Sequence, residues 1–154
     1  MASEKSYTIT LNNNRTEKEA TDYVVASDSR FWVPPSSARK HILSLMGLPA
    51  TFARAFDLVW VPDPIGVEGE LQVEDVDRIS LVELKTTRKY LPELPRGFFF
   101  GATENEFNLA RELGSRYQFC FVCLHPQSPG MCRMDLIELE SIIKTKRTQF
   151  QINL

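Results

Sequence analysis

Residues 81–87 (LVELKTT) carry an acid and a base two positions apart within an apolar, strand-like run. Side chains alternate along a strand, so Leu81, Glu83 and Lys85 share one face of the predicted strand. Burying two charges beside a core is costly unless they pair with each other or meet a metal ion or a phosphate. The two charges are therefore either a pair on an exposed edge strand or part of a site that binds a metal ion or a phosphate.

A second acid suited to such a site is Asp57, which lies among bulky apolar residues in the segment FDLVWV. A carboxylate in that setting is costly without a partner, so we expect it to join Glu83 from a neighbouring strand. Asp63 and Asp77 are the alternative acids. Asp63 is explained by its proline-rich turn, and Asp77 follows a turn-like run in which solvation explains its charge.

The elements that must position these residues follow from hydrophobic periodicity and capping signals. The predicted strands are residues 6–11, 56–61, 67–73, 78–86, 117–124, 133–139 and 148–154, with extended segments at 30–37 and 98–101. The predicted helices begin at Thr16, at Ser36 and at Thr103, and a short one covers residues 138–144. Thr103 and Glu106 form a predicted capping box, and Gly47 and Gly114 end their helices.

The order helix, strand with Asp57, strand, strand with Glu83 and Lys85, helix, strand resembles the core of the PD-(D/E)xK nuclease superfamily. The run from VELKTT through NEFNLARELGSRYQFCFV is especially similar to the Mrr-type branch and to a related uncharacterised domain found in helicases and defence proteins. The resemblance covers about residues 36–124. It implies one α/β (α+β) domain with a restriction-endonuclease-like core, a mixed sheet flanked by helices in the order αβββαβ.

The resemblance also implies an activity, the Mg²⁺-dependent hydrolysis of phosphodiester bonds in DNA, in restriction, phage defence or repair. Asp57 and Glu83 would supply metal ligands, the backbone carbonyl of Leu84 would add another, and Lys85 would orient the attacking water and the phosphate. Mn²⁺ is an alternative cation. Two other functions stay open: a non-catalytic module of the same fold in a larger assembly, and a structure-specific, resolvase-like or RNA-directed nuclease.

Basic side chains near this site are expected to contact the nucleic acid. They would bind phosphates and so position the substrate without reading its sequence. The predicted contact residues are Arg39, Lys40, Arg88, Lys89, Arg96 and Asn105. The helix that begins at Thr103 brings Asn105 and Glu106 toward the site, although capping also explains Glu106. A further basic cluster, Lys144, Lys146 and Arg147, is equally explained as a solvated surface.

Cys120, Cys123, His125 and Cys132 lie close together in sequence, so a zinc site must be considered. Zinc is disfavoured because Cys120 and Cys123 would point to opposite faces of their strand. An odd number of cysteines fits reduced, buried thiols better than a disulfide framework.

The totals describe an ordinary globular chain of 154 residues with a net charge of −2. That charge argues against a protein that coats nucleic acid non-specifically, although it allows a local basic site. There is no apolar run of the ~18 residues that a membrane helix needs. The start, MASEKSYT, lacks the pattern of a signal peptide, so we expect an intracellular, cytoplasmic protein, in the nucleoid or nucleus where its DNA lies.

Cutting both strands of a duplex with one site per chain favours a homodimer. The aromatic run GFFFG (residues 97–101), together with Trp32, offers material for a dimer interface that a small core would not fully absorb. The alternative is that these aromatic side chains belong to the core of a monomer.

Overall fold

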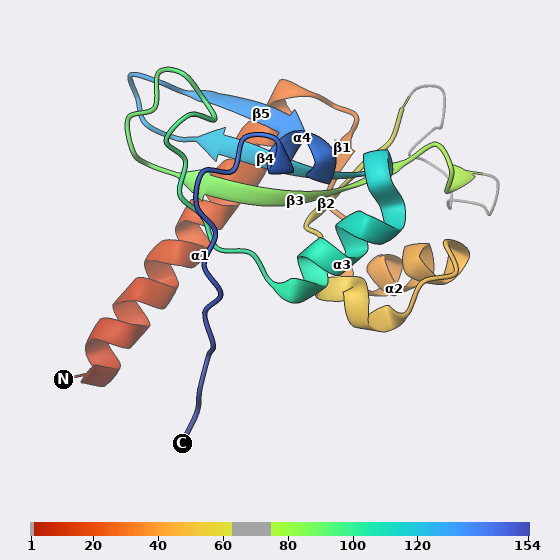
Figure 1. Ribbon diagram of the computed structural model, residues 1–154, viewed down its shortest axis with the longest axis horizontal. Helices are drawn as coiled ribbons and strands as arrows, with labels where there is room; N and C mark the ends of the chain where they lie inside the picture. The colour runs from red at the N-terminus through yellow and green to blue at the C-terminus, as the bar shows by residue number, and fades with distance from the viewer. Residues whose placement is uncertain (1, 63–74) are drawn as a thin grey trace.

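The computed structural model describes residues 2–62 and 75–154, with side chains from Arg15 onward. Its centre is a five-stranded mixed sheet (Figure 1). The strands lie in chain order: β1 Phe31–Trp32, β2 Leu58–Trp60, β3 Ser80–Thr87, β4 Tyr117–Cys123 and β5 Gly130–Met134. Strands β3 and β4 are parallel, and the other neighbouring pairs are antiparallel.

Helices cover both faces of this sheet (Figure 1). The described helices are α1 Ala2–Ser27, α2 Ser36–Leu45, α3 Glu104–Leu113 and α4 Leu136–Glu140, with 3₁₀ turns η1 Ala50–Arg54 and η3 Gly114–Arg116. Helix α1 packs on one face through Ala20 and Val24. Residues of α2, η1, α3 and α4 pack on the other face. The described chain is thus a mixed α/β structure in three layers.

Strand β3 separates two hydrophobic clusters by simple alternation. Leu81 belongs to the cluster on the α3 side, whereas Val82 belongs to the α1-side cluster and Leu84 packs against it. Alternation then places Glu83 and Lys85 on the same face as Leu81, as the sequence predicts. That face is the one that α3 covers, so the charged pair lies between the sheet and a helix.

Several predicted elements are confirmed. The predicted strands at 56–61, 78–86 and 117–124 are present as β2, β3 and β4, with β3 running one residue further to Thr87, and helix α2 begins at Ser36. Thr103 and Glu106 form the predicted capping box, and Gly114 ends α3. The predicted strand at 67–73 lies outside the described residues.

The prediction for the N-terminal region is wrong. One continuous helix, α1, replaces the predicted strand at 6–11 and the separate helix from Thr16. The run of asparagines at residues 12–14 is a weak helix breaker, because each asparagine disfavours a helix by less than about 1 kcal/mol and no glycine or proline interrupts the segment. Within the part of the chain that the structure describes, no helix has the length and apolar character needed to cross a membrane.

The C-terminal predictions need similar correction. Strand β5 ends at Met134, and α4 begins at Leu136 because Asp135 forms a capping box with Glu138. The predicted strand at 133–139 and helix at 138–144 are therefore displaced. Residues 148–154 and 98–101 have no regular secondary structure, and Pro35, with no side-chain cap, precedes α2 where Ser36 was expected as the cap.

Candidate active site

Asp57 immediately precedes β2 and lies across from Glu83. Leu58 pairs with Val82 in the antiparallel register, so extending that register by one residue places Asp57 opposite Glu83. The Asp57 N–H donates to the Val82 carbonyl at 2.8 Å, and its Oδ2 accepts a hydrogen bond from the Leu84 N–H at 2.8 Å. The backbone of β3 therefore fixes the Asp57 carboxylate in place on the site face.

The backbone of Leu84 is oriented toward the same location. Residues 82 and 84 of a strand direct their N–H and C=O groups to the same side. The Val82 carbonyl and the Leu84 N–H both bond to Asp57, so the Leu84 carbonyl also points to the side from which Asp57 approaches. Asp57 thus lies opposite Glu83, and strand geometry directs the Leu84 carbonyl toward the side on which Asp57 lies.

Lys85 is held between two acids. Its Nζ donates to Glu106 Oε1 at 2.5 Å and lies 3.4 Å from Glu83 Oε1. The Lys85 side chain is 11% exposed and that of Glu106 is 4% exposed, so this is a buried ion pair rather than a surface one. Breaking such a pair by removing one partner is strongly destabilising, because the other charge is left buried.

Glu106 reaches this position because it also caps its own helix. Its Oε2 accepts hydrogen bonds from the Thr103 N–H at 3.0 Å and the Thr103 hydroxyl at 3.1 Å, while Oε1 accepts from Lys85. Burial opposes ionisation of Glu106, but the hydrogen bonds from Lys85 and Thr103 outweigh it and hold the pKa of this carboxyl below its usual value. Glu106 is therefore the anionic partner of Lys85.

Glu83 is the most perturbed acid of the site. Burial raises the pKa of its carboxyl to about 10, and the neighbouring charges of Asp57 and Glu106 add to the rise while Lys85 opposes it. Its Oε2 is buried and has no hydrogen-bond partner among the described residues. Without a cation, the site thus relieves its excess negative charge by protonating Glu83.

Tyr117, the first residue of β4, lies near the three acids of the site, because their charges act on its hydroxyl. Its hydroxyl donates to the Ala55 carbonyl at 2.6 Å, which ties β4 to the turn before Asp57. Burial raises the pKa of this phenol well above its usual value, and the charges of Glu83, Glu106 and Asp57 act in the same direction.

Tyr117 is the part of the site that sequence reasoning missed, whereas Glu106 was expected to approach the site and its pairing with Lys85 was not. The capping box did signal that the Glu106 carboxylate turns back toward the start of its helix. No local sequence signal places Tyr117 near the site. Its position depends on the parallel register that pairs Leu81 with Tyr117, and this register joins two segments that are distant in sequence.

Arg39, a predicted nucleic-acid contact, is tied to the backbone around the site. Its guanidinium donates to the carbonyls of Phe56 at 2.7 Å and Asp57 at 3.4 Å, and also to Pro34 at 3.3 Å. These bonds hold α2 against the segment that carries Asp57. Arg39 therefore supports the geometry of the acid in this structure.

The other predicted contact residues lie on different elements and have different partners, and the bonds of Arg88 go to α1 on the opposite face of the sheet. Lys40, Lys89 and Arg96 are exposed. Arg88 donates to Thr16 and Glu19 of α1 at 3.2 and 2.7 Å, and Asn105 donates to the Thr51 carbonyl at 2.9 Å.

The alternative acids are not brought to the site. Asp77 is 87% exposed and lies 3.7 Å from Arg116. Asp63 lies outside the described residues. Among the acids that the structure describes, Asp57 is thus the one that joins Glu83.

The cysteines occupy both faces of the sheet. Cys120 is buried in the α1-side cluster, whereas Cys132 packs against the cluster on the opposite face. Burial raises the pKa of the Cys120 thiol to about 12. Cys123 Sγ lies 3.3 Å from the Lys89 carbonyl, and His125 Nδ1 accepts from the Gln127 N–H. Within the described residues, no group of three or more histidine, cysteine or acidic side chains is arranged as a ready metal site.

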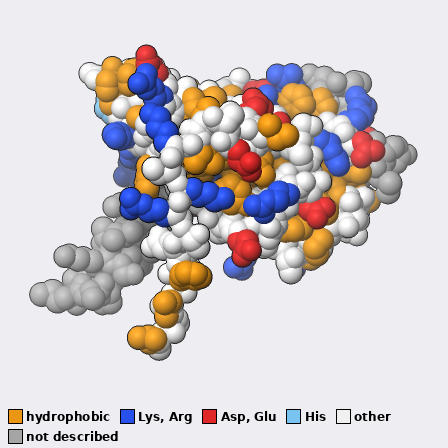
Figure 2. Space-filling view, in the orientation of Figure 1, with side chains coloured by type: hydrophobic (Ala, Val, Ile, Leu, Met, Phe, Trp, Pro, Cys, Tyr) orange, Lys and Arg blue, Asp and Glu red, His pale blue; other side chains and the backbone are white. Residues whose placement is uncertain are grey.

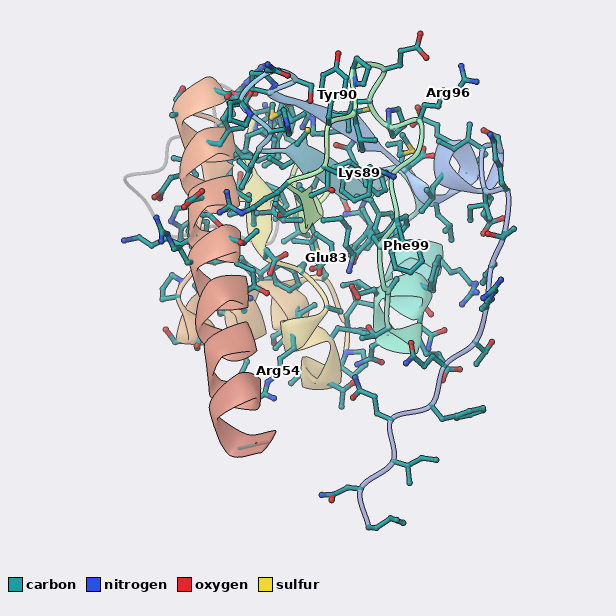
Figure 3. The ribbon with its side chains drawn as sticks, turned by 90° about the vertical axis from the view of Figure 1, so that its left-hand side faces the viewer. Arg54, Glu83, Lys89, Tyr90, Arg96 and Phe99 are labelled. Atoms are coloured by element: carbon teal, nitrogen blue, oxygen red, sulfur yellow. The ribbon has the colours of Figure 1, made fainter. Side chains whose placement is uncertain are left out.

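Viewed as in Figure 3, Glu83 lies centrally, with Arg54 on one side and Lys89 and Arg96 on the other. Figure 2 shows the C-terminal segment with apolar side chains standing clear of the body, where Phe150 and Ile152 are 80% and 79% exposed.

No family model, curated protein or solved structure matches this chain.

Proposed function

We propose that this chain is a Mg²⁺-dependent endonuclease that hydrolyses phosphodiester bonds in DNA, with Mn²⁺ as an alternative cation. The observation that carries the proposal is that the charges of Asp57 and Glu106 both act on the buried carboxyl of Glu83, while Lys85 pairs with Glu83 and Glu106. One ammonium cannot neutralise three carboxylates, and Glu83 Oε2 has no hydrogen-bond partner among the described residues. A site built in this way favours a cation.

The donors fit a hard divalent ion. Such ions take carboxylate and carbonyl oxygens, and Mg²⁺ keeps several waters as well. Asp57, Glu83 and the Leu84 carbonyl would hold it, with the unpartnered Glu83 Oε2 as the natural first donor. When bound, the cation supplies charge neutralisation at the phosphate and makes a water more acidic near neutral pH.

The residues of the chain would then act as follows. Lys85 donates hydrogen bonds to the phosphate oxygens and stabilises the charge that develops there. Glu106 positions Lys85 through the 2.5 Å contact, because Thr103 in turn fixes the Glu106 carboxylate. Arg39 positions Asp57 through its backbone carbonyl. In this scheme the α2–β2–β3–α3–β4 order is the nuclease-like core.

A non-catalytic module of the same fold is the second candidate. The observation in its favour is that Lys85 is already satisfied by Glu83 and Glu106, so the network would suffice as a structural ion pair. A purely structural network gains nothing from the unpartnered Glu83 oxygen, since leaving a buried acceptor without a donor costs about 1–3 kcal/mol.

The test uses protein stripped of metal with EDTA. Supercoiled plasmid, single-stranded DNA, branched DNA and RNA are incubated with Mg²⁺, Mn²⁺ or Ca²⁺, and melting curves are recorded under the same conditions. We expect cleavage with Mg²⁺ and Mn²⁺, and stabilisation by all three ions that is lost in Glu83→Gln. Stabilisation without cleavage of any substrate would favour the non-catalytic module.

The matched control is Glu93→Gln, because Glu93 is an exposed acid in the connection after β3. Metal-independent cleavage, or a Glu83→Gln variant as active as wild type, would contradict the proposal. Cleavage of RNA or branched DNA alone would assign the site to the RNA-directed or resolvase-like alternatives.

A further inference from the structure

Phe99 is an almost fully exposed aromatic side chain in the chain connection between β3 and α3. It is 93% exposed, while its two neighbours, Phe98 and Phe100, pack against the hydrophobic cluster on the site face. Leaving a phenyl ring in water is unfavourable, so a ring held in that position suggests a binding surface.

Two anchors fix the position of Phe99. The rings of Phe98 and Phe100 each lie 5.0 Å from the ring of Phe121, in edge-to-face contacts. The chain is therefore pinned on both sides of Phe99, which points away from the cluster. Its position is largely set before any ligand binds, and this lowers the entropic cost of binding.

The same anchors place Phe99 beside the candidate active site. Phe121 of β4 is the register partner of Lys85 of β3, and adjacent strands lie about 4.8 Å apart. The segment that packs on Phe121 thus passes one strand away from Lys85. In Figure 3, Phe99 lies to the right of Glu83.

Positive charge lies on either side of this ring. Lys89 and Arg96 lie on one side in Figure 3 and Arg54 on the other, and all three are exposed. Arg96 pairs with Glu93 at 3.2 Å, with side chains that are 74% and 71% exposed. Such surface pairs contribute little to stability, so Arg96 can exchange this partner for a phosphate.

We propose that Phe99 stacks on an unpaired base of single-stranded DNA whose phosphates lie along Lys89 and Arg54, with Glu83 between them. A phenyl ring offers no hydrogen bond to a phosphate or a base edge, so it gains mainly from the open π-face of a base. In a duplex those faces are already stacked on one another, whereas an unpaired nucleotide presents them. This inference rests on the proposed function, which makes DNA the substrate. It adds that the substrate has a single-stranded segment.

A second copy of the chain is the competing occupant, because the GFFFG run and Trp32 were expected to form a dimer interface. Most of that material is used elsewhere: Trp32, Phe98 and Phe100 all pack against the cluster on the site face. A single exposed ring is far smaller than the ~800 Å² per partner that a stable interface buries. Area and charge together favour a nucleotide.

The test measures binding in EDTA, so it is independent of metal and cleavage. A 12-nucleotide single-stranded DNA containing 2-aminopurine reports stacking through quenching of its fluorescence, and anisotropy gives affinity for this strand, its duplex and the RNA of the same sequence. Phe99→Ala should weaken single-strand binding at least about 5-fold and abolish quenching, with little effect on the duplex. Phe99→Trp should retain both.

Phe150→Ala is the matched control, because Phe150 is 80% exposed in the C-terminal tail. The inference is overturned if Phe99→Ala binds single strands like wild type, if it weakens duplex binding equally, or if wild type binds RNA as tightly as DNA. A change of oligomeric state in Phe99→Ala by light scattering would assign the ring to a dimer. If Phe99→Ala loses the quenching but the wild-type protein cleaves none of the substrates, the proposed function is rejected and the inference about Phe99 stands.

Discussion

Glutamine at position 83 should remove most of the pH dependence of stability of the metal-free protein. The carboxyl of Glu83 has an ordinary pKa of 4.5 and a folded-state pKa of about 10. Between those values the folded protein holds a proton that the unfolded chain has released, so stability is highest at acid pH and falls as pH rises through this window.

The size of the effect follows from the same linkage. One proton changes the free energy of unfolding by at most about 1.4 kcal/mol per pH unit, so the loss from pH 5 to pH 8 is at most about 4 kcal/mol. Glu106 acts in the opposite sense, because its pKa is lowered, and its contribution is already complete above its ordinary value of 4.5. Glutamine keeps a donor that can replace the proton of Glu83, so Glu83→Gln should vary little over this range.

The assay is urea denaturation in EDTA at pH 5, 6, 7 and 8, for wild type, Glu83→Gln and the Glu93→Gln control. We expect wild type and the control to lose up to about 4 kcal/mol as pH rises, and Glu83→Gln to be the most stable of the three at pH 8. If the free energy of unfolding of Glu83→Gln falls with pH as steeply as that of wild type, Glu83 is not the group that takes up the proton, and the reasoning fails.

Further predictions concern the partners of the site. Lys85→Ala should abolish cleavage of plasmid DNA and also lower stability by about 3 kcal/mol, because it leaves Glu106 charged and buried. The double variant Lys85→Ala/Glu106→Gln should recover more than half of that stability in urea denaturation while remaining inactive. Thr103→Ala removes the hydroxyl that accepts from the Glu106 N–H and should cost about 1 kcal/mol in the same assay, with Thr103→Ser restoring it. Tyr117→Phe leaves the Ala55 carbonyl without its donor, so its melting temperature should fall by an amount that corresponds to about 1–2 kcal/mol.

The parts of the structure that were predictable from sequence depend on local signals. The alternation around Glu83 and the capping box of α3 each lie within a few residues, so the sequence predicts them correctly. Residues 6–11 show that a short alternation is a weak signal, because a continuous helix overrides it there.

Tertiary pairing accounts for what the sequence did not predict. The Lys85–Glu106 pair joins a strand to a helix 21 residues later. The bonds of Arg39 depend on how α2 docks beside β2. A basic residue that lies near a site in sequence can contact a ligand or donate hydrogen bonds to backbone carbonyls. The residue type alone does not distinguish these two roles.

The hydrogen bond from Leu84 to Asp57 also has a consequence for solubility. The described pairing of β2 with β3 runs only from Ser80 to Val82, so β3 continues past its neighbour. A strand that extends in this way offers N–H groups to strands of other molecules, which is how sheet edges promote aggregation. The Asp57 carboxylate occupies the first of these groups at Leu84. Asparagine at position 57 keeps an acceptor for the Leu84 N–H, whereas alanine does not. If the alanine variant is insoluble and the asparagine variant is soluble, the side chain at position 57 protects this sheet edge from pairing with other molecules.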